Sequence, residues 1–193
     1  MAVPWTGPFM LEESSLRRWI EEAKAGDFAA FERLLLQHER QVLRTALRLL
    51  GNSEDARDVA QEVFIRLHKH LGAVRENEEL IRWLYRTTVN LCIDAHRRSR
   101  RRPAGAEPRE LIDQSLDPEA LAAHAQHRAL ISEALDTLTP KERAAIVLRD
   151  LENRTTTEAA LILGSSEATV RSHISSARIK IRQFVDAKLG RGK

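Results

Sequence analysis

Apolar residues recur every three or four positions along most of the chain and do not alternate with polar ones. This spacing puts them on one face of an α-helix, so the sequence predicts an all-α protein. Ser15 is expected to cap a first short helix, which ends at Gly26. Asp27 is expected to cap a second helix, from Phe28 to Leu50.

Asn52 or Ser53 is expected to start a third helix, because a broad apolar stripe follows: Ala56, Val59, Ala60, Val63, Phe64, Leu67 and Leu71. The polar segment Gly72 to Glu79 is predicted to be a loop. A fourth helix is expected from about Leu80, with apolar residues at Trp83, Leu84, Leu91 and Ile93. It runs into the most basic part of the chain, Arg97 to Arg102.

The segment Pro103 to Pro118 contains three prolines and a glycine and has little periodicity, which is typical of a linker. When extended it could reach roughly 50 Å. The chain is therefore expected to consist of an N-terminal extension (1–15), a first helical block (16–102), this flexible linker (103–118) and a second helical block (119–193). Two blocks joined in this way could sit on separate patches of one large partner.

The second block has strong helix-start signals. Asp117 with Pro118 can open it, and Thr139 with Glu142 and Thr155 with Glu158 form two capping boxes. The second box starts a short helix that ends at Leu163. A tight turn, Gly164 to Ser166, and a long helix from Glu167 follow, which is the outline of a helix-turn-helix. The apolar side of the long helix consists of Val170, Ile174, Ala177, Ile181 and Phe184.

The opposite side of this long helix carries serines and bases. At 100° per residue, Arg171, Ser175, Arg178 and Arg182 form one outward stripe, with Ser172 and Ser176 further round. Guanidinium groups contact phosphates and guanine edges, and short serines let the backbone come close to a duplex. A solvated basic face is the alternative for the charges alone. The turn, the caps and the helix length together favour a helix that lies in the major groove of DNA.

Composition narrows the classes of function. The net charge is only +3, but the pI is about 9.3 and the bases are clustered, which indicates a polyanionic partner, nucleic acid or a membrane surface. The single cysteine, Cys92, excludes an internal disulfide framework and a thiolate zinc site. No apolar run approaches the roughly 18 residues of a membrane span, and the N-terminus does not resemble a signal peptide. We therefore expect a soluble, cytoplasmic protein with no membrane insertion.

The first block offers two further surfaces. Trp83 and Tyr85 lie among bases, a combination that suits unstacked single strands, although Trp83 could equally belong to the core. Asp55, Asp58 and Glu62 lie at i, i+3 and i+7 and form an acidic stripe beside the apolar one. This stripe could be solvated or could dock a basic protein helix.

Two long segments resemble a known family. LLGNSEDARDVAQEVFIRLHKHL with IRWLYRTTVNLCIDAHRRSRRR is similar to region 2 of bacterial RNA polymerase sigma factors of the extracytoplasmic-function (ECF) group. ALDTLTPKERAAIVLRDLENRTTTEAALILGSSEATVRSHISSARIKI resembles their region 4. The resemblance covers about residues 27–102 and 130–185 and implies a factor that binds core RNA polymerase and starts transcription of a specific regulon.

The resemblance also implies roles for individual residues. The resemblance assigns docking on core polymerase, through its β′ and β subunits, to Asp55, Asp58 and Glu62, with the β′ coiled coil as their partner. Binding of the −10 promoter element falls to Asn77, Arg82, Tyr85, Arg86, Asn90, Asp94, Arg97 and Arg98, and the Gly72 to Glu79 loop matches the segment that holds an extruded base. Binding of the −35 element falls to Thr169, Arg171, Ser172, Ser175 and Arg178, to which the outward stripe adds Arg182. Control by an anti-sigma factor is implied as well.

The sequence departs from the family pattern in a few places. Arg57 stands where an acid is usual, so the docking stripe is less acidic than is typical. Thr157 and Ala159 would lighten the packing under the recognition helix, and His173 stands where arginine is common. We expect these changes to affect promoter preference more than the family assignment.

Two other classes of protein fit the sequence less well. The second block also resembles the output domain of LuxR-type regulators, but such a protein would need a sensory block with alternating strands and helices, and none is visible. An enzyme lacks support, since no phosphate loop or nucleophile elbow is present and no cofactor is indicated. The pairs His68 with His70 and His124 with His127 diverge on a helix and have no evident third metal ligand.

Overall fold

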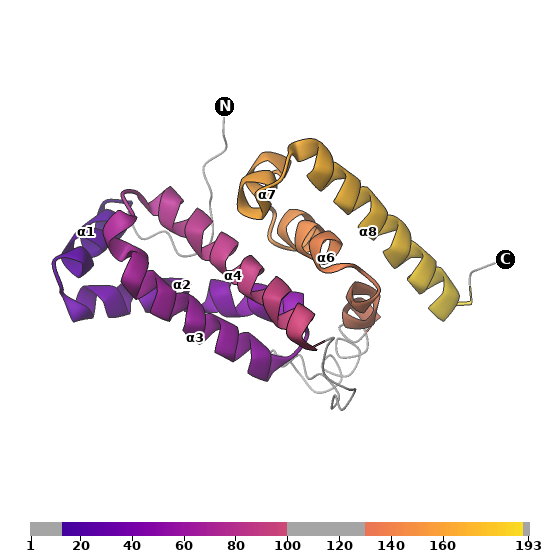
Figure 1. Cartoon of the computed structure of the whole chain (residues 1–193), viewed down its shortest axis with the longest axis horizontal. Helices are drawn as coiled ribbons and strands as arrows, with labels where there is room; N and C mark the ends of the chain where they lie inside the picture. The colour runs from indigo at the N-terminus through magenta and orange to yellow at the C-terminus, as the bar shows by residue number, and fades with distance from the viewer. Residues whose placement is uncertain (1–12, 100–129, 191–193) are drawn as a thin grey trace.

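The computed structural model describes residues 13–99 and 130–190, and every regular element in these ranges is helical (Figure 1). The first block is a bundle of four α-helices with a 3₁₀ turn, η1, before the last of them. The elements are α1 (Glu13–Lys24), α2 (Phe28–Leu50), α3 (Ser53–His70), η1 (Leu71–Ala73) and α4 (Asn77–Ser99). This arrangement confirms the all-α prediction for the described residues.

The caps explain where the first helices begin and end. Asp27 accepts hydrogen bonds from the amides of Ala29 (2.8 Å) and Ala30 (3.3 Å) at the start of α2. Gly51 ends α2 in the left-handed region, with φ of 70°. Asn52 caps α3 by accepting from the Glu54 amide at 2.8 Å. The stripe predicted for α3 is buried throughout and forms the centre of the bundle.

Two predicted boundaries in the first block are wrong. Ser15 lies inside α1 and does not cap it, because the described helix already begins at Glu13. The Gly72 to Glu79 loop is shorter than expected, since η1 takes up its start and α4 begins at Asn77, three residues before Leu80. Glu78 and Glu79 suit the first turn of α4, where carboxylates interact favourably with the helix dipole.

The second block begins, in the described chain, with helical residues 130–136. It continues through α6 (Pro140–Ile146), the π-helical turn η2 (Val147–Leu151), α7 (Thr156–Leu163) and α8 (Glu167–Lys188). Both predicted capping boxes are present, at Thr139 with Glu142 and at Thr155 with Glu158. The predicted linker and the expected cap at Asp117 and Pro118 lie outside the described residues.

The two blocks are packed against each other, which the linker prediction did not anticipate (Figure 1). α4 contacts α6 and α7, and α2 contacts η2. Buried apolar residues from both blocks form one continuous cluster, with Val89 and Cys92 from the first block and Leu148 and Ile162 from the second among its members.

Candidate functional site

The helix-turn-helix forms as the sequence predicts. α7 ends at Gly164, whose φ of 60° requires the left-handed region, and Ser166 caps α8 by accepting from the Thr169 amide at 3.1 Å. Val170, Ile174 and Ala177 bury one side of α8 against α6 and α7. Thr157 is exposed and donates to Glu167 Oε1 at 2.8 Å, so it ties the two helices together at the turn and is not part of the packing beneath α8.

The residues predicted to bind the −35 element all lie on the exposed side of α8. They are Thr169, Arg171, Ser172, Ser175, Arg178 and Arg182. In the structure Arg171 pairs with Glu167 at 2.5 Å, and Arg178 makes a two-pronged contact with Asp150 at 2.8 and 3.1 Å. The hydrogen bonds and negative charge of Asp150 raise the pKa of Arg178 further above its ordinary value.

A groove runs along this face of α8 and includes two residues that the sequence analysis missed. Arg149, from η2, and Thr156, from α7, line it together with Arg171, Ser175 and Arg182. Neither stands on α8, so the periodicity of that helix could not reveal them. A guanidinium and a hydroxyl beside the stripe are suitable donors for a DNA phosphate.

The predicted −10 residues divide into two groups. Arg82, Arg86, Asn90, Asp94 and Arg98 follow one another at intervals of four on α4 and are all exposed. Arg97 lies beside them and is 3.8 Å from Asp94. Two thirds of the surface of the Arg97 side chain is in solvent. This row of side chains is open to a nucleic acid strand.

Tyr85 and Asn77 are placed differently. Only 2% of Tyr85 is exposed, because the second block covers it. Burial, reinforced by the nearby charge of Glu152, raises the pKa of Tyr85 to about 12. Asn77 is half-buried in the first turn of α4, and its Oδ1 has no hydrogen-bond partner among the described residues. In this conformation Tyr85 is not accessible to DNA.

The acidic stripe of α3 lies beside an apolar groove. Asp55 and Asp58 are exposed, and Glu62 is half-buried and accepts from Arg66 at 2.7 Å. The groove runs between α2 and α3 and is lined mainly by Phe31, Leu35, Leu43, Phe64 and Ile65, with Arg57 at one side. Ile65 is 45% exposed, and Leu36 on α2 is 62% exposed. Acidic and apolar contacts are thus available together on one surface.

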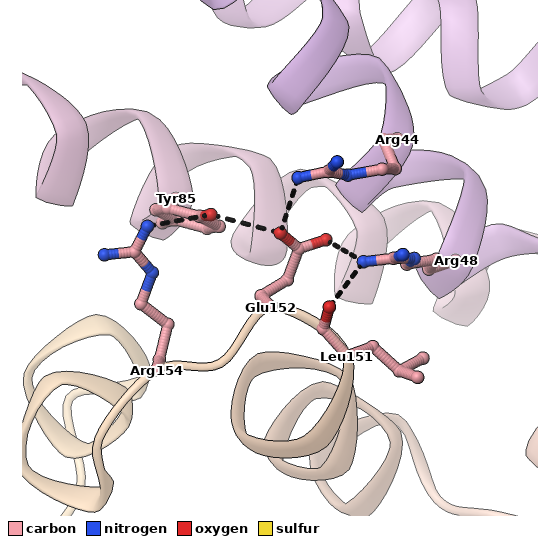
Figure 2. A network of polar contacts seen from close by, with 6 residues as sticks. All are labelled: Arg44, Arg48, Tyr85, Leu151, Glu152 and Arg154. Carbon is pink, nitrogen blue, oxygen red and sulfur yellow. Dashed lines mark hydrogen bonds and ion pairs between the residues drawn. The ribbon is translucent and has the colours of Figure 1, made fainter. Parts of the chain in front are cut away.

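The contact between the blocks was not predictable from the sequence. Figure 2 shows Glu152 between Arg44 and Arg48 of α2 and Tyr85 of α4, with Arg154 on the other side of the tyrosine. Glu152 is 67 to 108 positions away from Arg44, Arg48 and Tyr85 along the chain, and no local pattern connects it with them. They come together only in the folded chain, where 1% of the Glu152 side chain is exposed.

Two histidines of the first block, His68 and His70, take part in aromatic contacts. The His70 ring stacks on Trp83 with 4.9 Å between centroids, and His68 meets Phe31 edge-on at 5.2 Å. Trp83 is half-buried against the core. The described residues contain no cluster of three or more potential metal ligands. None of the helices in the described ranges is long and apolar enough to cross a bilayer. His124 and His127 lie outside these ranges.

Comparison with known proteins gives consistent matches over both blocks. A model of sigma-70 region 2 matches residues 34–102, and one of sigma-70 region 4 matches residues 128–181. The ECF RNA polymerase sigma factor SigM of Mycobacterium tuberculosis is 32% identical over 161 residues, which cover 83% of this chain and 80% of SigM. The RNA polymerase sigma-H factor of Pseudomonas aeruginosa is 29% identical over 179 residues, 88% of this chain and 93% of that protein.

Two solved structures share the fold. CnrH in complex with the cytosolic domain of CnrY matches with a TM-score of 0.67 at 24% identity, over 90% of this chain and 98% of the other. The sigma factor RpoE of Bartonella quintana, in complex with the anti-sigma factor NepR, matches with a TM-score of 0.59 at 20% identity, over 81% and 96%. At these identities the likeness concerns the fold.

Proposed function

Because the chain belongs to the ECF group of bacterial RNA polymerase sigma factors, we propose that it docks on core polymerase through its first block and binds a promoter with both blocks. Sigma factors are transcription initiation factors and not catalysts. We assign residues 16–102 to the region 2 domain and 119–193 to the region 4 domain, joined by residues 103–118. The exposed stripe of α8, opposite a face on which Val170, Ile174 and Ala177 are buried, is the observation that carries this proposal.

The docking surface consists of the acidic stripe Asp55, Asp58 and Glu62 and the apolar groove beside it. A basic and partly apolar helix pair, such as a coiled coil of the β′ subunit, would satisfy both parts. Arg57 reduces the negative charge of this surface. A partner helix that keeps clear of Arg57 and contacts Glu62 would still meet the apolar groove and two exposed carboxylates, those of Asp55 and Asp58.

The DNA-binding surfaces are the stripe of α8 for the −35 duplex and the row on α4 for the −10 element. Serines on α8 let the helix backbone approach the major groove, while Arg171, Arg178 and Arg182 reach phosphates or guanine edges. On α4, Arg82, Arg86 and Arg98 would follow the backbone of a separated strand. Tyr85 would add a stacking surface once it is uncovered.

Regulation by an anti-sigma factor is part of the same proposal. Such a partner would cover the groove and the acidic stripe and so compete with polymerase. Each of the two solved structures with this fold contains a partner protein, the cytosolic domain of CnrY in one and the anti-sigma factor NepR in the other, and this supports the proposal. We place the protein in the cytoplasm, with polymerase.

The test is co-elution of the purified chain with bacterial core RNA polymerase. The native chain is expected to elute with polymerase, and a variant carrying Asp58→Lys and Glu62→Lys is expected to lose the complex. The matched control, Glu21→Lys with Glu22→Lys, reverses two carboxylates on α1 and should bind normally. Equal binding by all three proteins would place docking elsewhere, and no binding by the native chain would favour a stand-alone regulator.

A further inference from the structure

Glu152 is the centre of the contact between the two blocks. It follows η2, and its Oε1 accepts from Arg48 Nη1 at 2.6 Å, while its Oε2 accepts from Arg44 Nη2 at 3.3 Å and from the Tyr85 hydroxyl at 3.2 Å (Figure 2). Arg48 Nη1 also donates to the Leu151 carbonyl at 2.8 Å. One carboxylate of the second block therefore satisfies two guanidinium groups and a hydroxyl of the first.

Other residues of the second block close the same contact. Arg154 Nη2 donates to the Tyr85 hydroxyl at 3.2 Å, and its guanidinium carbon lies 4.6 Å from the centre of the tyrosine ring. Arg143 Nε donates to the Arg48 carbonyl at 3.2 Å. The ring of Tyr85 is thus covered on one face, and its hydroxyl is held by two charged residues from the other block.

If the second block moved away, the first block would expose Arg44 and Arg48 beside the ring of Tyr85. Guanidinium groups that hold phosphates, combined with a ring on which a base can stack, are the elements of a single-strand binding site. Glu152 is an anion placed where a phosphate would bind. Half of the Arg44 side chain already faces solvent, so a strand could reach the edge of this set.

We propose that Arg44, Arg48 and Tyr85 form a single-stranded DNA binding site that Glu152 masks in the closed molecule. Neither arginine belongs to the surfaces assigned above, and the inference rests on the proposed function only in naming DNA as the nucleic acid. Closure and strand binding exclude each other, because both require the same two guanidinium groups and the same ring. Opening of the blocks is then a condition for full engagement of the −10 strand.

The test uses the full chain and a fluorescein-labelled (dT)₂₀ oligonucleotide, with affinity measured by anisotropy at constant salt. Glu152→Gln keeps the side-chain size but removes the charge, and it is expected to bind (dT)₂₀ roughly fivefold more tightly or better, because more molecules are open. The matched control is Glu142→Gln, since Glu142 is a buried carboxylate whose partners, Thr139 and Lys180, belong to its own block. It should bind like the native chain.

A second readout reports opening directly. Tyr85 is the only tyrosine in the chain, so 3-fluorotyrosine gives a single ¹⁹F resonance. Glu152→Gln should move this resonance towards that of an exposed tyrosine, and adding Arg44→Ala and Arg48→Ala should remove the gain in (dT)₂₀ affinity. An exposed resonance without tighter binding, or tighter binding that survives loss of both arginines, would overturn the proposal. An unchanged resonance in folded Glu152→Gln protein would do so as well.

If Glu152→Gln does not fold, Tyr85→Phe decides the question. This variant keeps the ring for stacking and loses the hydroxyl that Glu152 and Arg154 hold, so tighter (dT)₂₀ binding is expected and unchanged binding would overturn the proposal. Polymerase is absent from these assays, and Asp58 and Glu62 are untouched. Failure here and failure of polymerase docking are therefore separate results.

Discussion

His38 shows how a single residue of α2 can control stability. It is 4% exposed, and its Nε2 has no hydrogen-bond partner among the described residues. Burial lowers the pKa of His38 to about 4, so the native imidazole stays neutral. The unfolded chain takes up a proton near the ordinary pKa of about 6.5. Stability contributed by the neutral native form is therefore present above pH 6.5 and is lost as the pH falls towards 4.

We expect His38→Leu to reduce this loss. Between pH 7.5 and 5, the free energy of unfolding of the native chain should fall by about 2 kcal/mol more than that of the variant. Urea unfolding at the two pH values measures the difference. His173→Gln, which removes a partly exposed imidazole on α8, is the control. An identical pH dependence for the native chain and His38→Leu would show that His38 titrates normally in the folded protein.

At the scale of elements, α8 was predictable because one of its faces is apolar and the opposite face carries serines and arginines. The sequence contained its cap, its apolar side and its cationic stripe; the cap and the exposed stripe lie where they were expected, and of the apolar side Val170, Ile174 and Ala177 are buried while Ile181 and Phe184 are partly buried. The pairing of Arg178 with Asp150 was not predictable, since Asp150 belongs to η2, 28 positions earlier. The start of α4 was missed for a local reason: polar residues in a first helical turn resemble a loop.

The exposed arginines of α8 should control the salt dependence of duplex binding. Arg182→Ala removes one exposed cation, so the slope of log K against log salt for a labelled 30-bp duplex should become less steep by about 1. Anisotropy titrations from 50 to 200 mM NaCl measure the slope. Lys141→Ala, an exposed cation in the first turn of α6, should leave it unchanged. A native slope for Arg182→Ala would exclude a phosphate contact by this residue.

At the scale of the whole molecule, the sequence predicted two blocks in the right order but not their association. Periodicity identifies the buried face of each helix, yet it does not say whether that face is covered by its own block or by the other one. Cys92 is an example: it was noted only as a lone cysteine, and it lies 2% exposed within the shared core, where burial raises its pKa to about 12.

The shared core predicts that the blocks unfold together. Trp19 and Trp83 lie in the first block and the second block has no tryptophan, so tryptophan fluorescence follows unfolding of the first block, whereas circular dichroism at 222 nm reports helices of both. Urea transitions by the two methods should coincide for the native chain. In Glu152→Gln they should separate, with Glu142→Gln tested beside it as the control. Separate transitions in the native chain would mean that the contact between the blocks adds little to stability.

The contact between Glu152 and α2 joins parts of one polypeptide, and this changes how strong it has to be. A covalent linker between two binding surfaces gives an effective concentration of the order of millimolar, whatever the concentration of the protein. A contact with an intrinsic dissociation constant of that order would keep about half of the molecules closed. Dilution would not open them, whereas a single cut in the connecting segment would make closure depend on concentration.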